Sequence, residues 1–213
     1  MNKLILILLF IPLAVRGQDG TGLRTGITAK KDISARWKAE VQLQTRFNSN
    51  ISFLQTYLAE AGVSYEIIKG MEASAFYRYA YRRKNTEKDF KERHRFYADL
   101  SYGRKIHKVK LEYRLRYQHQ YKDNDSGEAE FDESYLRNKL EAKYAGKGKF
   151  RPYVSADLFY RVGSGIDQVR PKAGVDFRFN KKNILDISIF KDIDLTGTNT
   201  YGPVIGLNYT YKF

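Results

Sequence analysis

The chain has 213 residues, no cysteine and a formal net charge of +14 at pH 7. Without cysteine it cannot form disulfides, and it cannot carry the lipid-modified N-terminal cysteine of a lipoprotein. After residue 17, no apolar run approaches the roughly 20 residues of a transmembrane helix. Any membrane span in this chain must therefore be built from β-strands.

The first 17 residues have the pattern of a secretory signal peptide. Lys3 precedes an unbroken apolar run from Leu4 to Val15, which is too short to cross a bilayer but has the length of a signal h-region. Gly17 would end the signal and Gln18 would begin the mature chain. The alternative is that this run forms a buried strand or helix of the mature fold.

Most of the remaining chain alternates apolar and polar residues, which is the period of a β-strand. The pattern is clearest at 35–47, where Val41 and Leu43 alternate with Gln42 and Gln44, and at 109–121. Ten strands are predicted, over residues 35–47, 54–67, 72–83, 93–104, 109–121, 134–144, 151–162, 168–180, 184–195 and 201–213. Residues 18–34 are a candidate eleventh.

The connections between these strands alternate between short turns and longer links, and the link at 163–167 is counted among the longer ones. Barrels of the outer membrane have this asymmetry, with tight periplasmic turns and longer external loops. We therefore predict an all-β protein, an up-and-down antiparallel transmembrane β-barrel of about ten strands, with twelve as the alternative because bacterial single-chain barrels have even counts.

Three regions follow from this prediction. Residues 1–17 are the cleaved signal peptide, and residues 18–34 are an N-terminal segment that forms a partial strand or inserts into the lumen. Residues 35–213 form the barrel.

Alternation alone fits a soluble periplasmic, lipocalin-like binding barrel as well, with apolar residues inside. Strands of eleven to fourteen residues, longer than the five or six of soluble proteins, and aromatic residues at both strand ends favour the membrane barrel. Its polar phase would then form a salt-bridged network in the lumen. The residues assigned to this lumen network are Arg36, Lys38, Glu40, Arg78, Arg82, Arg95, Asp99, Glu112, Arg114, Arg116, Arg137, Glu141, Asp157, Arg170, Lys172, Asp176 and Arg178.

The last strand alternates aromatic residues and ends on one, with Tyr209, Tyr211 and Phe213. This pattern resembles the insertion signal that the barrel-assembly machinery reads on outer-membrane barrels. The alternative is an ordinary soluble edge strand.

The whole mature chain, roughly residues 20–213, resembles the domain of unknown function 2490 family, small exported barrels of Gram-negative bacteria. The resemblance rests on the signal peptide, the block ISARWKAEVQLQTRFNSN at 33–50, the block YRLRYQHQY at 113–121 and the final phenylalanine. It implies an outer-membrane barrel and assigns no activity.

Catalytic candidates are few, because the chain has only three histidines. His94 and His119 fall on the apolar phase at the external ends of neighbouring strands, where a lipid-modifying enzyme would work. Ser126 or Ser134 could supply a nucleophile, but no spacing selects one. The alternative is that both histidines anchor the barrel at the lipid interface. No metal site or cofactor is predicted.

The sequence favours a non-enzymatic, monomeric barrel in the cell outer membrane, with a structural or interaction role and slow anion passage through a basic lumen. Its expected partners are outer-membrane lipid, lipopolysaccharide and, during insertion, the barrel-assembly machinery. The alternative function is an acyl hydrolase or transferase acting on membrane lipids. An export signal and inward-facing arginines argue against nucleic acid as a partner.

Overall fold

The computed structural model of the chain describes residues 20–48, 50–83, 89–124, 128–197 and 202–213. The predicted signal peptide at 1–17 lies outside the described residues. Within the described ranges every regular element is a β-strand, and they contain no helix with the length and apolar character needed to cross a membrane. The strands are β1 (Gly22–Asp32), β2 (Trp37–Asn48), β3 (Phe53–Ile68), β4 (Met71–Arg82), β5 (Lys91–Ile106), β6 (Val109–Asp123), β7 (Ala129–Tyr144), β8 (Phe150–Arg161), β9 (Gly165–Arg178), β10 (Asn183–Lys191), β11 (Ile193–Asp194) and β12 (Pro203–Lys212).

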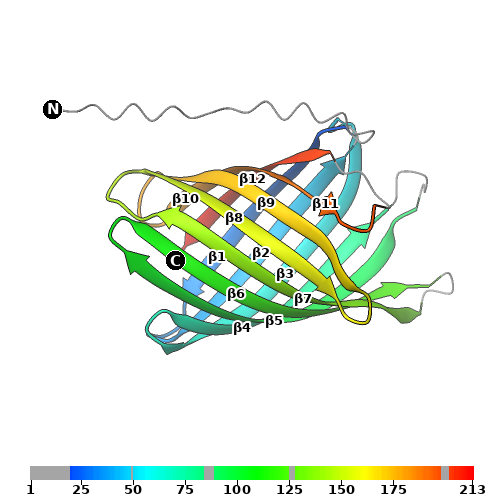
Figure 1. The fold of residues 1–213 in the computed structure, drawn as a ribbon, viewed down its shortest axis with the longest axis horizontal. Coiled ribbons are helices and arrows are strands. Elements are labelled where there is room, and N and C mark those ends of the chain that lie inside the picture. Colours follow the sequence, from blue (N-terminus) through cyan, green and yellow to red (C-terminus); the bar gives the residue numbers. More distant parts are fainter. Residues whose placement is uncertain (1–19, 49, 84–88, 125–127, 198–201) are drawn as a thin grey trace.

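The strands form one sheet that closes on itself into a barrel (Figure 1). Each strand from β1 to β10 pairs antiparallel with the next, β10 pairs with β12, and β12 pairs with β1. The two-residue β11 pairs with β9 just beyond the end of β10. Eleven strands, β1 to β10 and β12, therefore make the ring. The predicted all-β, up-and-down barrel is confirmed, and its strand number lies between the ten and twelve considered.

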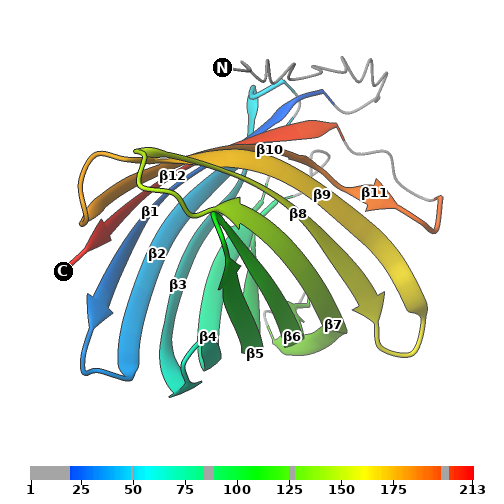
Figure 2. The same cartoon turned by 60° about the vertical axis from the view of Figure 1, so that its left-hand side comes forward.

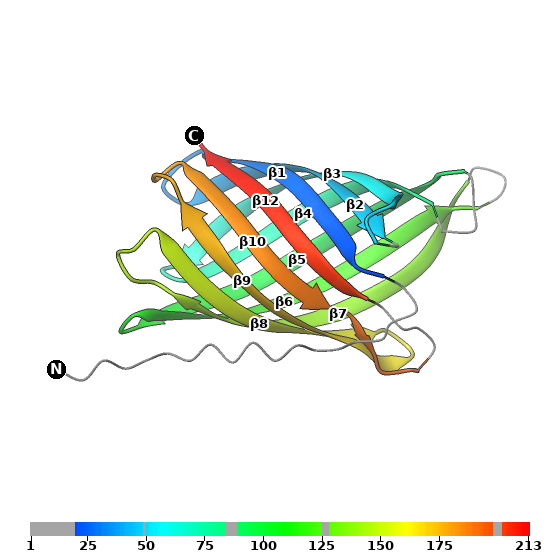
Figure 3. The same ribbon diagram turned by 90° about the horizontal axis from the view of Figure 1, so that it is seen from above.

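The ring closes through a parallel pair (Figure 3). β1 and β12 are in parallel register from Gly22 opposite Val204 to Lys30 opposite Lys212. An odd number of strands that alternate in direction must bring two strands of the same direction together at closure. We call the β1–β12 pair the parallel seam.

The N-terminal segment was predicted as a partial strand or a lumen insert, but Gly22–Asp32 is a full barrel strand paired on both sides. The barrel therefore begins at residue 22 rather than 35. The alternation of β1 is weak because its outward phase includes Thr25 and Ala29 and its lumen phase includes Gly26. A strand is predicted from sequence by the difference in hydrophobicity between its two faces, and in β1 this difference is small.

The two faces of the barrel have opposite chemistry. On the outside, Val41, Leu111 and Leu207 are 51%, 41% and 37% exposed. On the inside, Asp99 and Arg116 are buried at 9% and 7%. This polarity is the reverse of the soluble barrel considered as an alternative, whose apolar side chains would fill the interior.

Successive connections alternate between the two ends of the barrel (Figure 2). The connections after β2, β4, β6, β8 and β10 lie at one end, called here the loop end, and those after β1, β3, β5, β7 and β9 lie at the other, the turn end. The β8–β9 connection, residues 162–164, is shorter than predicted. Gly163 and Gly165 allow this tight turn because they adopt φ values of 85° and 97°, which other residues rarely take.

Candidate functional site

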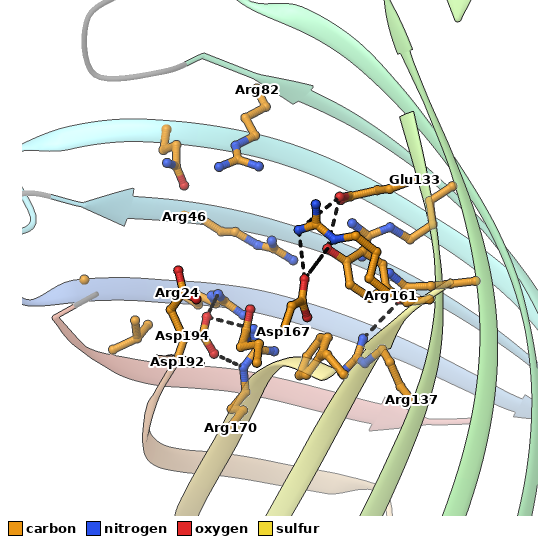
Figure 4. A pocket seen from close by; sticks show the side chains of 18 of the residues that line it. Arg24, Arg46, Arg82, Glu133, Arg137, Arg161, Asp167, Arg170, Asp192 and Asp194 are labelled. Atoms are coloured by element: carbon orange, nitrogen blue, oxygen red, sulfur yellow. Dashed lines mark hydrogen bonds and ion pairs between the residues drawn. The ribbon is translucent and has the colours of Figure 1, made fainter. Parts of the chain in front are cut away.

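The loop half of the lumen contains a cavity of about 520 Å³ (Figure 4). Its lining comes from strands all around the barrel and reaches strand ends at the loop end, including Asn48 and Arg82. Ten arginines line it, against four carboxylates. The arginines are Arg24, Arg46, Arg78, Arg82, Arg95, Arg114, Arg116, Arg137, Arg161 and Arg170, and the carboxylates are Glu133, Asp167, Asp192 and Asp194.

The floor of the cavity is a connected set of buried ion pairs. Arg116 binds Asp99 through two hydrogen bonds of 2.7 Å each, from Nε and Nη2 to the two carboxylate oxygens. Arg137 donates to Asp157. Arg114 joins the two pairs, with its guanidinium nitrogens 4.0 Å from Asp99 and 3.5 Å from Asp157. The four neighbouring strands β5 to β8 are thereby linked side by side along one wall of the lumen.

Aromatic rings on the lumen face hold several of these guanidinium groups flat. Arg116 lies over Tyr97 at 3.7 Å, and Arg137 lies over Phe159 at 4.1 Å. Phe190 lies between Arg24 and Arg170, at 4.5 and 5.1 Å. Such stacking fixes the orientation of a guanidinium and weakens its need for water. Each of the three rings stands at a strand position that faces the lumen, where the neighbouring lumen-facing residues are polar. An aromatic residue at such a position is the sequence signal that could have identified them.

One wall of the cavity carries two further ion pairs. Arg170 donates from Nη2 to Asp192 at 2.8 Å, and Arg24 lies 3.9 Å from the same carboxylate. Arg161 contacts Asp167 at 2.8 Å, and the Tyr135 hydroxyl donates to Asp167 at 2.9 Å. Arg24 and Arg161 were not among the predicted lumen residues, because β1 had not been assigned with certainty and Arg161 ends its strand.

Arg46 and Arg95 line the cavity without an ion pair to a carboxylate of the described residues. Arg46 donates to the side-chain oxygen of Gln44 at 2.8 Å, and Arg95 donates from Nε to Gln120 at 3.0 Å. Both partners are neutral, so neither charge is balanced locally. Figure 4 shows the Arg46 guanidinium pointing into the cavity.

The turn half of the lumen is different, because most of its charges are paired. Lys38 donates to Glu72 at 2.6 Å, and Lys30 lies 2.5 Å from Glu40. Further pairs are Lys139 with Glu141 at 2.6 Å, Lys143 with Asp176 at 3.2 Å, Lys172 with Asp186 at 3.5 Å and Lys110 with Glu112 at 2.5 Å. Lysine and carboxylate alternate around this end of the barrel.

The residues predicted for the lumen network thus fall into three groups. Arg78, Arg82, Arg95, Arg114, Arg116, Arg137 and Arg170 line the cavity, Asp99 and Asp157 lie in its floor, and Lys38, Glu40, Glu112, Glu141, Lys172, Asp176 and Arg178 lie in the turn half. Arg36 does not belong to the network. It is exposed in the β1–β2 turn and donates to the Tyr65 hydroxyl at 3.2 Å, because the chain reverses there before β2 begins.

The two candidate histidines lie on the outer face near the loop end, and the structure gives each its own partners. His119 Nδ1 lies 2.6 Å from Ser134 Oγ, and its Nε2 lies 3.1 Å from the Tyr121 hydroxyl. His94 Nδ1 lies 2.7 Å from the Tyr77 hydroxyl. Ser126, the other nucleophile considered, lies outside the described residues.

The predicted insertion signal lies on the last strand. Tyr209 and Tyr211 are on the outer face of β12, and Phe213 follows the strand, with the rings of Tyr211 and Phe213 edge to face at 4.9 Å. In the part of the chain that the structure describes, no group of three or more histidine, cysteine, aspartate or glutamate side chains could hold a metal ion.

Comparison with known proteins gives one family. A search of curated proteins returns no match. The family model described as "Protein of unknown function (DUF2490)" matches residues 22–200, from the first barrel strand to the link before the last. The predicted resemblance is confirmed, and the chain belongs to the DUF2490 family.

Proposed function

We propose that this protein is an outer-membrane β-barrel whose lumen admits anions from the loop end and passes them slowly. The observation that carries the proposal is the excess of arginine in a cavity enclosed by an apolar outer surface. The two halves of the proposal, membrane location and anion entry, rest on separate evidence.

The membrane location is supported by the outer surface. Val41, Leu43 and Leu140 are each more than half exposed in the middle of their strands. Aromatic side chains lie at both ends of this apolar belt, as at the two interfaces of a membrane barrel. Those at the loop end are Tyr57, Tyr81, Tyr117, Phe131 and Tyr160, and those at the turn end are Trp37, Tyr102, Tyr144, Phe150, Phe179 and Phe213. A surface this apolar would aggregate in water.

Anion entry is supported by the charge of the cavity. Ten arginines against four carboxylates create a positive potential that attracts anions and repels cations. Passage beyond the cavity is restricted, because the ion-paired side chains of β5 to β8 project into the lumen below it and most charges beyond them are paired. A barrel of this size leaves little room between its side chains. We therefore expect rare, small current events rather than an open pore.

Planar bilayers test this proposal directly. Detergent-purified protein, first checked for heat-modifiable migration on gels, is inserted under a KCl gradient and the reversal potential is measured. A reversal potential of the sign for chloride supports the proposal. Cation selectivity, or a protein that stays soluble and monomeric without detergent, would overturn it.

The contact between His119 and Ser134 favours one second candidate, an acyl hydrolase acting on membrane lipid. If Nε2 of His119 carries the proton and donates to Tyr121, Nδ1 is free to accept the Ser134 hydroxyl proton. Ser134 could then attack a lipid ester, form an acyl-enzyme and release the alcohol with that proton, after which water completes hydrolysis. Ser134 is only 7% exposed, so an ester reaches it only when the surrounding rings move.

Fatty-acid release from mixed micelles of phospholipid or lipopolysaccharide tests this candidate. Release that is lost in Ser134→Ala and His119→Ala, and kept in Thr45→Ala, supports it. Thr45 is the matched control because its hydroxyl also faces outward and also has a side-chain partner, Thr25 at 2.7 Å. Absence of release from the wild-type protein would rule the candidate out.

A further inference from the structure

We infer that the cavity is a binding site for a compact anion carrying two or more phosphate or carboxylate groups, with Arg46 and Arg95 as its principal binding residues. The inference rests on the proposed entry of anions from the loop end and adds the chemical class of the ligand. It is carried by the way the cavity distributes its charges.

Most arginines of the cavity already have a carboxylate partner. Arg78 donates to Glu60 at 2.5 Å, and Arg116, Arg137 and Arg114 share Asp99 and Asp157 in the floor. Arg24 and Arg170 share Asp192, and Arg161 contacts Asp167. An entering anion does not have to break these pairs. It can use Arg46 and Arg95, whose described partners are the neutral side chains of Gln44 and Gln120.

The charge balance indicates how many negative charges the ligand carries. The four carboxylates of the lining, together with Glu60, Asp99 and Asp157 just below it, make seven. Ten arginines face these seven carboxylates. The excess is three positive charges, so the cavity favours a ligand that carries more than one negative charge. A single monovalent anion would neutralise only a third of the excess.

The donors that line the cavity suit oxyanions. A guanidinium presents N–H groups in a planar fork that matches carboxylate and phosphate oxygens. Three further buried side-chain nitrogens of the lining have no hydrogen-bond partner within the described structure: Nε of Arg114, Nε of Arg137 and Nε2 of Gln168. Buried donors without acceptors are costly, and a ligand rich in acceptor oxygens would relieve that cost.

The cavity offers few contacts to an aromatic or apolar ligand. Its lining includes two aromatic rings, and guanidinium groups already lie over both: Arg137 and Arg170 over Phe159, and Arg161 over Tyr135 at 5.4 Å. The volume of about 520 Å³ lies within the range of small-molecule sites, about 300 to 1,000 Å³. Recognition would therefore depend on charge and hydrogen bonds, which favours a compact polyanion over a nucleoside or a fatty acid.

Phosphate groups could reach this site as a dissolved anion or as the headgroup of a lipid. The strands surround the cavity, so a lipid whose chains remain in the bilayer would have to bend its headgroup over the rim of the barrel. Two probes separate these sources: pyrophosphate, which is free in solution, and the short-chain lipid dihexanoyl phosphatidic acid, which carries the same group on a glycerol.

The test is isothermal titration calorimetry on the full barrel in detergent, with pyrophosphate, citrate, dihexanoyl phosphatidic acid and chloride as probes. We expect pyrophosphate and citrate to bind at least about tenfold more tightly than chloride. We expect Arg46→Gln and Arg95→Gln each to weaken pyrophosphate binding by about tenfold or more, the cost of losing a charge-assisted hydrogen bond. Heat-modifiable migration confirms that each variant is folded.

Arg178→Gln is the matched control, because it removes the same charge from the turn half of the lumen, outside the cavity. Its affinity for pyrophosphate should be unchanged. An equal loss in Arg178→Gln, or no binding of either multivalent anion, overturns the inference. If bilayers nevertheless show chloride-selective current, the inference is wrong but the proposed function is retained. Absence of both the current and the binding contradicts the inference and the proposed function alike. Tighter binding of pyrophosphate than of the lipid assigns the site to a dissolved anion, and the reverse assigns it to a headgroup.

Discussion

At the scale of single residues, the lumen shows how charge is kept inside a barrel that has no apolar core. The Asp99 side chain is 7% exposed, and it accepts two hydrogen bonds from Arg116 while Arg114 lies nearby. A buried charge of this kind is tolerated because its partners replace the water it has lost. Each partner is therefore much more sensitive to loss of the other than a surface pair would be.

We predict that Asp99→Asn destabilises the barrel by about 3 kcal/mol, because it leaves the buried Arg116 without a counter-charge. The free energy of unfolding can be measured by urea titration in lipid vesicles. Glu112→Gln is the control, since its pair with Lys110 is largely solvated, and we expect a change within about 0.5 kcal/mol. Equal effects of the two substitutions would show that the Asp99 pair is no better shielded from water than the exposed one.

At the residue scale, the sequence predicts which way a strand side chain faces but not which side chain it pairs with. Strand parity is enough to tell that Arg78, Arg116 and Asp157 face the lumen, because side chains alternate strictly along a strand. Parity does not tell that Arg116 meets Asp99 while Arg95 meets only a glutamine, since that depends on how neighbouring strands are shifted and on how the barrel curves. Which arginines remain available to a ligand could therefore not be predicted.

At the scale of elements, the parallel seam is the least expected feature. Ten of the eleven ring strands were predicted from alternation, and β1 was left open because both of its faces mix small and polar residues. The neighbouring strands determine its conformation, since β2 and β12 each offer it an edge to pair with, and an unpaired strand edge is unfavourable. Such information lies outside the segment itself, so no local pattern in residues 18–34 could have shown it.

We predict that cysteines at positions 25 and 207 form a disulfide across the parallel seam. Thr25 and Leu207 are register partners and both face outward, so their separation is within the reach of a disulfide, about 4.4 to 6.8 Å between Cα atoms. The protein has no cysteine of its own, so no other disulfide can form within the chain. The readout is a shift of the unheated and heated bands on non-reducing gels of the double variant Thr25→Cys, Leu207→Cys.

The off-register pair Thr25→Cys with Tyr211→Cys serves as the control. Tyr211 is opposite Ala29, four residues along β1, so these two sulfurs would be roughly 13 Å apart along the strand. Cross-linking of the off-register pair in place of the register pair would mean that the seam is shifted or open.

At the scale of the whole molecule, the distribution of side chains decides the solvent that the barrel requires. The predicted polarity follows from strand length and aromatic placement, and the exposed Val41, Leu111 and Leu207 agree with it. The sequence could not show that the lumen divides into a loop half with unpaired arginines and a turn half in which most charges are paired, because both halves carry basic and acidic residues in the same alternation.

We predict that an arginine on the outer face is costly while one on the inner face of the same strand is tolerated. Leu43→Arg should destabilise the barrel in lipid vesicles by about 2 to 4 kcal/mol, the cost of a cation near the middle of a bilayer. Gln42→Arg places the same group in the lumen opposite Glu60 and should change the free energy of unfolding much less. The reverse order would mean that the outer surface of this barrel faces water.

The parallel seam also places the two ends of the chain at opposite ends of the barrel. β1 starts at the loop end and β12 finishes at the turn end, whereas in an even ring both termini would share one side. With the barrel in the outer membrane, as proposed, and its turns in the periplasm, we expect an epitope joined ahead of Gly22 to be accessible to antibody on intact cells, and one joined after Phe213 only once the cells are opened. Assembly in that location would carry the leading end of the chain through to the cell exterior.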